Sequence, residues 1–310
     1  MEKKEYTSPY DFEGKIPLKQ AIILGLQHVL AMFVGNLTPV LIITGACAAM
    51  HDADVFAAIQ VSLLQNAMLI AGVVTLVQLF SIGPIGGKVP IIMGTSSGFI
   101  GTAKAIGALF GYGALMGASF IGGIFEMILG YFIKPLRKLF PPVVTSLVII
   151  SIGLSLLPVG INYFGGGSGA ADFGSINHLI VASFVIVVIL IAKQFKGFIN
   201  NASVLIGIVA GYILAILLQM VDFTQVQEAA WFSLPVFMPV SFTFNPEAII
   251  AMGIMFIATT VETIGDVSGV ANGGLDREAS DSELQGGVMA DGLGSSACCQ
   301  IPASLRMWVL

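Results

Sequence analysis

Residues 254–274 read IMFIATTVETIGDVSGVANGG, an apolar run that contains two carboxylates. A helix that crosses a bilayer needs about 20 mostly apolar residues. A carboxylate at the centre of such a helix costs about 2.5–3.5 kcal/mol, so ionisable residues there usually serve a function. Glu262 and Asp266 stand four residues apart and therefore share one helix face. The stretch predicts a membrane helix with a functional acidic face.

The composition extends this interpretation to the whole chain. Of the 310 residues, 56% are hydrophobic and 10% are charged, whereas soluble domains have about 25% charged residues. We therefore expect an all-α polytopic membrane protein, because unpaired strands cannot cross lipid. The candidate spans are 18–43, 55–80, 89–108, 112–133, 142–158, 177–193, 201–220, 247–270 and an incomplete 284–299.

The positions of the basic residues predict the orientation. If the N-terminus is cytoplasmic, every Lys and Arg except Lys104 and Arg306 falls at the N-terminus or in a loop after an even-numbered span. Cytoplasmic loops are enriched in these residues. The first 16 residues have no apolar segment typical of a cleaved signal peptide. We expect a multi-pass protein of the cytoplasmic membrane.

The third candidate span, VPIIMGTSSGFIGTAKAIG at 89–107, is a poor helix sequence in its first half. Pro90, Gly94, Gly98 and the hydroxyl cluster at 95–97 predict an unwound segment. Irregular backbone at membrane depth occurs only where it is buried in protein or lines a cavity, and broken helices of this kind bind substrates in transporters. The alternative is that the small residues only allow close helix packing.

Further polar residues lie within apolar stretches. The repulsion between Glu262 and Asp266 favours uptake of a proton, and the pair could also accept N–H groups from a flat polar ligand. Asp291 is a weaker candidate of the same kind. Glu126 and His28 are more readily explained as buried groups with hydrogen-bond partners in the fold. For all five residues the alternative is a purely structural network.

Other function classes lack support in the sequence. It shows no Ser/His/Asp arrangement, no phosphate-binding glycine loop, no metal-ligand spacing of Cys and His, and no basic patch for nucleic acid. The pattern indicates a transporter rather than an enzyme, without a cofactor. A proton is the expected coupling ion, and sodium remains an alternative.

Four stretches together resemble one family. GLQHVLAMFVGNLTPVLI (25–42), VPIIMGTSSGFIG (89–101), VETIGDVSGV (261–270) and GGVMADGLGS (286–295) resemble spans one, three, eight and nine of the nucleobase–ascorbate transporters, or nucleobase:cation symporter family 2. The resemblance extends to about residue 296. The ETIGD form is similar to the xanthine and uric acid branch, whereas uracil transporters tend to have His in place of Asp266.

The resemblance implies a fold of fourteen spans in two inverted seven-span repeats, with a core and a gate domain. A cytoplasmic tail (1–16) would precede core spans 1–4 (17–133) and gate spans 5–7 (134–222). An extracellular amphipathic linker (223–246) would lead to span 8 and the start of span 9 (247–295). The expected partners are a purine, membrane lipid and a second copy in a homodimer.

The resemblance also implies the site. Substrate would bind between spans three and ten, close to span eight. The substrate-binding residues in this chain would be Ser97, Gly98, Phe99 and Glu262, and the proton-coupling network would add Asp266, His28 and Asp291. One departure concerns stacking: members often have an aromatic residue directly after GTS, where this chain has Ser97, with Phe99 two residues later.

The last residues, SSACCQIPASLRMWVL at 295–310, depart from the family. Codons can be chosen for residues 299–308 that spell PNTSFAQNVG, the motif expected in span ten, when read one base earlier. We therefore expect residues 296–310 to be an out-of-frame tail and the chain as written to be impaired. A natural truncation is the alternative, and the coding DNA distinguishes the two.

Three functions remain open from the sequence. The first is proton-coupled uptake of purines such as xanthine or uric acid, with uracil as a variant. The second is anion transport in the related sulfate/bicarbonate fold, which the acidic residues disfavour. The third is an inactive fragment or regulator that associates with a full-length relative.

Overall fold

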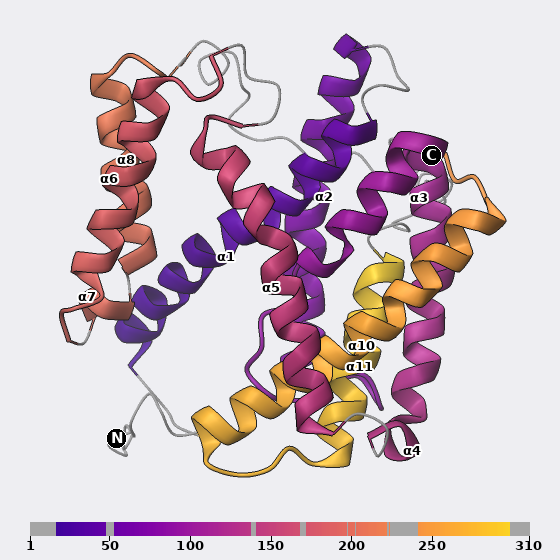
Figure 1. Ribbon diagram of the computed structural model, residues 1–310. Coiled ribbons are helices and arrows are strands. Elements are labelled where there is room, and N and C mark those ends of the chain that lie inside the picture. Colours follow the sequence, from indigo (N-terminus) through magenta and orange to yellow (C-terminus); the bar gives the residue numbers. More distant parts are fainter. Residues whose placement is uncertain are drawn as a thin grey trace, which may run out of the picture. The chain divides into compact units, whose positions relative to one another are not determined.

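The computed structural model describes residues 17–47, 53–137, 141–167, 172–196, 198–201, 203–221, 223 and 241–297. In these ranges the regular elements are helices, and one isolated bridge joins Ile82 to Ile85. The all-helical fold class is confirmed for this part of the chain. The helices are α1 (Leu18–Cys47), α2 (Ala53–Phe80), η2 (Ser97–Phe99), α3 (Ile100–Tyr131), α4 (Ile133–Arg137), α5 (Pro142–Phe164), α6 (Ile176–Ala192), α7 (Phe198–Asn201), α8 (Ser203–Leu217), α10 (Pro246–Leu275) and α11 (Asp281–Ala297) (Figure 1).

The described helices match a protein that crosses a membrane several times. Four stretches are long and apolar enough for a span: Gln60–Phe80, Ser97–Tyr131, Val143–Phe164 and Pro246–Leu275. Shorter apolar helices cover Gly35–Cys47, Ile176–Ala192 and Ser203–Leu217. The inverted repeat stays a prediction. The predicted cytoplasmic tail, the aromatic part of the linker and most of the expected out-of-frame tail lie outside the described residues.

The chain forms two compact units. The first holds Met32–Ile152 and the described residues 241–297, and the second holds residues 17–31 and the described residues from Gly153 to 223. Both α1 and α5 contribute one half to each unit. This division does not test the predicted boundaries of the core and gate domains, which stay predictions.

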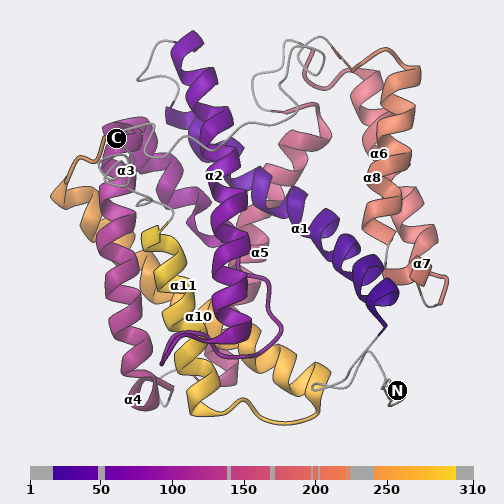
Figure 2. The same cartoon turned by 180° about the vertical axis from the view of Figure 1, so that it is seen from behind.

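Within the first unit, α3 lies against α10 and α11, and α11 also lies against α2 (Figures 1 and 2). Apolar side chains fill the contact between α3 and α10, with Ile106 and Leu115 of α3 near Met252 and Phe256 of α10. Each of these four side chains is buried. The packing brings the acidic stretch of α10 beside α3 and α11.

The backbone before Ser97 is not helical, as predicted for the third span. Residues 81–96 connect α2 to the short 3₁₀ turn η2, and α3 starts only at Ile100. The predicted span 89–108 is therefore a helix only in its second half. It continues into the predicted span 112–133 through Gly111, whose φ of 79° lies in the left-handed region that glycine adopts readily. The two predicted helices form one kinked element.

Neighbouring helices provide hydrogen-bond partners for backbone groups of residues 81–96. Gln78 of α2 is fully buried, and its side chain accepts the Gly87 N–H at 2.9 Å. Thr75, also on α2, accepts the Met93 N–H at 3.0 Å. The Gly286 carbonyl of α11 accepts the Gly86 N–H at 2.9 Å. The bond to Met93, which lies in the predicted third span, helps irregular backbone to persist there, because an unsatisfied peptide group in a membrane costs several kcal/mol.

The turn between α10 and α11 is held by a capping box. The Ser280 hydroxyl accepts the Glu283 N–H at 3.3 Å, and the Glu283 carboxylate accepts the Ser280 N–H at 2.8 Å. Arg277 donates from Nη1 to the same carboxylate at 2.8 Å. The hydrogen bond from Arg277 lowers the pKa of Glu283 from 4.5 to about 2.

Substituting Glu283→Gln should make the stability of this turn less dependent on pH. The folded-state pKa is depressed, so the stabilisation is fully present above the ordinary value of 4.5 and is lost as the pH falls through about 2. We expect the melting temperatures of wild type and variant to differ above pH 4.5 and to converge towards pH 2. Thermal unfolding in detergent at several pH values measures this. A difference that grows on acidification would contradict the prediction.

In the second unit, α6 and α8 pack along a stripe of small residues. Gly207 and Gly211 of α8 lie one turn apart, and a Cβ at either position would overlap Ile189 or Val185 of α6. Helices in membranes approach closely through such small-xxx-small patterns. The two glycines therefore set the distance between α6 and α8.

Substituting Gly207→Val should separate these helices, because the added methyl groups meet the Ile189 side chain. Overpacking of this kind costs about 1–3 kcal/mol. We expect a lower melting temperature in detergent. Gly153→Val on α5 is the matched control, since a Cβ at that position meets no described atom within 4 Å. Equal losses in both variants would show that helix propensity, and not packing, is responsible.

Candidate functional site

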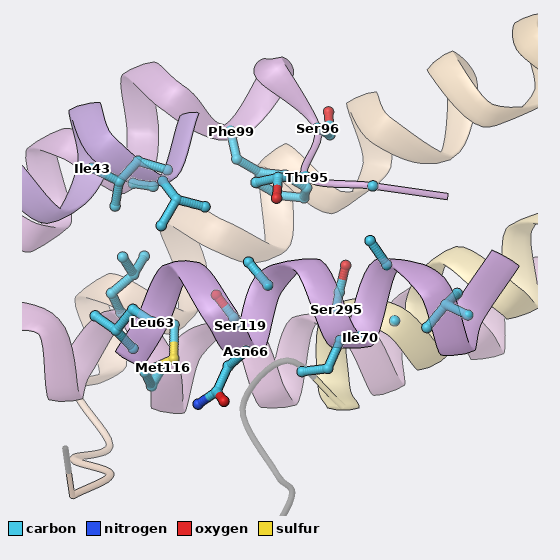
Figure 3. Close-up of a pocket in the computed structure, with 18 of the residues that line it drawn as sticks. Ile43, Leu63, Asn66, Ile70, Thr95, Ser96, Phe99, Met116, Ser119 and Ser295 are labelled. Carbon is cyan, nitrogen blue, oxygen red and sulfur yellow. The ribbon is translucent and has the colours of Figure 1, made fainter. Parts of the chain in front are cut away.

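A cavity of about 160 Å³ lies within the first unit, between the second half of α1, α2, the segment before η2, and α3, α10 and α11. In Figure 3, Thr95, Ser96 and Phe99 lie along one side of the cavity, opposite Leu63, Asn66 and Ile70. The walls are mostly apolar with a few polar groups. The polar and aromatic lining residues are Thr44, Asn66, Thr95, Ser96, Ser119, Asp291, Ser295, Phe99, Tyr112 and Phe256.

Asn36 of α1 holds the broken span at the cavity wall. Its side chain is 5% exposed, and Oδ1 accepts the Thr95 N–H at 2.8 Å. A Cβ at Gly94 would overlap this same oxygen. The absence of a side chain at position 94 therefore allows α1 to approach the segment closely enough for the hydrogen bond.

Ser96 connects the cavity wall to the acidic stretch. Its hydroxyl donates to Glu262 Oε2 at 2.9 Å and accepts the Gly98 N–H at 3.1 Å. Ser96 thereby caps η2 and fixes one oxygen of a carboxylate from α10. A Cβ at Gly98 would stand 3.2 Å from the same oxygen, so glycine leaves room for the carboxylate. The start of α3 and the Glu262 side chain meet at this point.

Asp291 of α11 forms a second acidic wall. Its Oδ2 accepts a hydrogen bond from the Thr263 hydroxyl at 2.6 Å, and the residue lines the cavity. Thr263 follows Glu262 directly on α10. Asp266, one turn further along α10, is exposed and interacts electrostatically with Glu262 and Asp291. Three carboxylates from two helices are thus close enough to repel one another.

An aromatic pair, Phe99 of η2 and Phe256 of α10, lines the cavity. The ring centroids of Phe99 and Phe256 are 4.7 Å apart, and their planes are inclined by 56°. Tilted pairs of this kind are favourable. Phe256 is 1% exposed and holds Phe99, whose ring lines the cavity. A flat ligand would find an aromatic wall next to Ser96.

The structure brings most of the predicted site residues together. Phe99 and Asp291 line the cavity, while Glu262 reaches its wall through Ser96. Ser97 and Gly98 form the turn beside it, and Asp266 is the exposed neighbour one turn from Glu262. His28 is an exposed side chain of α1 in the second unit. The functional roles of all seven residues stay predictions.

Sequence reasoning missed several contributors. The signal for Asn36 in the sequence is a polar residue within the apolar helix α1. Asn66, Ser119 and Ser295 gave no signal, because single small polar residues are common in membrane helices. In the described part of the chain, no group of three His, Cys, Asp or Glu side chains could hold a metal ion.

Comparison with known proteins identifies similar sequences over nearly the whole chain. A family model described as Permease family matches residues 19–299. A protein of Clostridium perfringens named as a candidate purine permease is 38% identical over 288 residues, which are 93% of this chain. A uric acid permease of Bacillus subtilis and a uric acid transporter of Escherichia coli are each 33% identical over 88% of the chain. The chain spans 62%, 63% and 56% of these three relatives, respectively.

Proposed function

Because this chain belongs to this permease family, the nucleobase–ascorbate transporters, we propose that its residues serve the proton-coupled uptake of purine nucleobases, xanthine or uric acid, across the cytoplasmic membrane. The family consists of permeases and not of enzymes. The chain is accordingly a multi-pass membrane protein, and we propose that its N-terminus lies on the cytoplasmic side.

The contact between Ser96 and Glu262 supports this function most directly. It places a carboxylate of α10 next to the break in the third span, beside an aromatic side chain that lines the cavity. A purine is a flat ring with N–H donors at its edge. Glu262 would accept such a donor, and Phe99 would contact the ring face. The polar groups and the aromatic wall match the two kinds of surface that a nucleobase presents.

The size of the cavity also suits a small flat ligand. An apolar cavity of about 150 Å³ can bind benzene, and the cavity here is about 160 Å³. Its lining is mostly apolar, with few polar groups, as in typical small-molecule sites. A single heterocycle is therefore the appropriate ligand class, and a peptide or an oligosaccharide is too large.

The group of carboxylates supports proton coupling. Glu262 interacts electrostatically with Asp266 and Asp291 within the membrane-spanning part of the protein. Carboxylates that repel one another in a low dielectric bind protons in place of carrying several charges. Binding of one proton with each substrate would couple uptake of the substrate to the proton gradient.

Uptake experiments test this proposal. Cells that lack purine permeases and express the protein should accumulate radiolabelled xanthine or urate at a reduced rate, because the chain as written is expected to be impaired, and a protonophore should abolish the accumulation. Labelled uracil and sulfate serve as comparison substrates. Accumulation of uracil alone would indicate a pyrimidine permease. Accumulation of sulfate alone would support the anion transporter, and purine uptake that requires sodium but no proton gradient would refute the coupling.

A further inference from the structure

Glu126 of α3 is the most deeply buried acidic side chain in the described part of the protein, and the proposed transport site makes no use of it. Its exposed fraction is 0%. It lies opposite α10 at Thr259 and Thr260, one turn before Glu262. Asp291 of α11 and Glu262 of α10 are the ionisable groups that interact with it electrostatically.

The hydrogen-bond partners of Glu126 are few. Its Oε1 lies 3.1 Å from the Thr259 hydroxyl and 3.4 Å from the Thr260 hydroxyl. Its Oε2 is buried and has no hydrogen-bond partner among the described residues. An ionised carboxylate can accept about four hydrogen bonds. Glu126 therefore has far less support than a buried negative charge requires.

A count of hydroxyl hydrogens reduces that support further. Each threonine hydroxyl carries one hydrogen. The Thr260 hydroxyl lies 2.8 Å from the Phe256 carbonyl oxygen, much nearer than Glu126 at 3.4 Å. The Thr260 hydroxyl therefore donates its hydrogen to the Phe256 carbonyl. The Thr259 hydroxyl lies 3.1 Å from Glu126 Oε1 and 3.2 Å from the Phe256 carbonyl oxygen, so its hydrogen can go to either acceptor. When both hydroxyls donate to their own helix, they present only lone pairs to Glu126.

Asp291 provides a contrast on the neighbouring helix. It receives a hydroxyl hydrogen bond from Thr263 at 2.6 Å, and it borders the cavity. Asp291 thus has a hydroxyl donor at 2.6 Å and borders the cavity. The nearest hydroxyl to Glu126 is 3.1 Å away, and Glu126 is not among the residues that line the cavity. Of these two neighbouring carboxyl groups, the environment favours the charge on Asp291 and the proton on Glu126.

We propose that Glu126 is a proton-binding residue, a neutral carboxylic acid that donates a hydrogen bond from Oε1 to Thr259 and so ties α3 to α10 one turn before Glu262. The proton supplies a hydrogen for this contact when both threonine hydroxyls donate to their own helix. The bond fixes the helix that positions Glu262 against Ser96. Glu126 acts as a positioning residue, and its role does not depend on which solute is transported.

Infrared spectroscopy of the purified protein tests the protonation directly. At neutral pH, the spectrum of the wild type minus that of Glu126→Gln should show the carbonyl stretching band of a protonated carboxyl group. The same band should persist in Glu262→Gln and in Asp291→Asn. Absence of the band from the first difference, or its loss in Asp291→Asn alone, would place the proton elsewhere and overturn the proposal.

Thermal unfolding tests the positioning role. The amide of Glu126→Gln can donate to Thr259 as the acid does, so its melting temperature should stay within about 2 °C of the wild type. Glu126→Leu cannot donate, and its melting temperature should fall by about 5 °C or more. Equal losses in the two variants would refute a neutral donor. Glu247→Gln and Glu247→Leu, at an exposed position on α10, are the matched controls.

A double-mutant cycle tests the partner. Thr259→Val removes the acceptor, so it should destabilise the wild-type background but have little further effect in Glu126→Leu. Additive losses would show that the two side chains do not interact. All of these tests use unfolding or spectra of the purified protein. A failure of the proposed uptake function would therefore leave their results unaffected.

Discussion

Cells that express Glu262→Gln should take up labelled purine about ten- to a hundredfold more slowly than cells with the unaltered protein at low substrate concentration. Hydrogen bonds to a charged group contribute about 1.5–3 kcal/mol, and each 1.4 kcal/mol corresponds to a factor of ten. The amide keeps the shape of the side chain and can still contact Ser96. It loses the charge that a substrate N–H would meet and the capacity to bind a proton.

The measurement is initial uptake of labelled xanthine or urate over a range of external pH. Unaltered protein should show uptake that depends on pH, and the residual uptake of Glu262→Gln should be almost independent of it. Glu247→Gln is the matched control, because Glu247 is an exposed carboxylate in the first turn of the same helix. Normal uptake and an unchanged pH profile in Glu262→Gln would refute both the substrate contact and the proton coupling.

The second large effect is expected for Asn36→Ala. Asn36 Oδ1 accepts the Thr95 N–H, and its removal leaves a peptide group of the broken span without that bond. An unsatisfied buried donor costs about 1–3 kcal/mol. Because Thr95 precedes Ser96, the loss should also loosen the wall that holds Glu262. We expect a lower melting temperature and weaker substrate affinity together.

Thermal unfolding and the substrate concentration at half-maximal uptake measure these two effects. Asn272→Ala is the control, since Asn272 is an exposed asparagine near the end of α10. The control should leave both quantities unchanged. If Asn36→Ala lowered stability without weakening affinity, the broken span would not form part of the binding site.

The sequence predicted those features that depend on local composition. Apolar length predicted the helices, and the run of Pro90, Gly94 and Gly98 predicted the missing helix before Ser97. The sequence did not predict the continuous helix through Gly111, because a glycine at a helix kink and a glycine in a loop look the same in sequence. The predicted spans 89–108 and 112–133 are therefore separate in the prediction but continuous in the structure.

The partners of the acidic residues could not be predicted from the sequence. Glu262 bonds to Ser96, and Glu126 bonds to Thr259; the paired residues are 166 and 133 positions apart. Helix periodicity places residues on a face but does not identify the helix that this face meets. The spacing correctly put Glu262 beside Asp266, yet only the packing shows that one is half-buried and the other exposed.

The bond from the Gly86 N–H to the Gly286 carbonyl has a consequence for biosynthesis. The two residues are 200 positions apart in the chain. At about 5–20 residues per second, the ribosome needs roughly 10–40 s to synthesise the intervening residues. During this interval the Gly86 peptide group, in the loop between the second and third predicted spans, is without its final partner. Water or the insertion machinery must solvate it until α11 emerges, so the loop that leads into the third span is completed only late in synthesis.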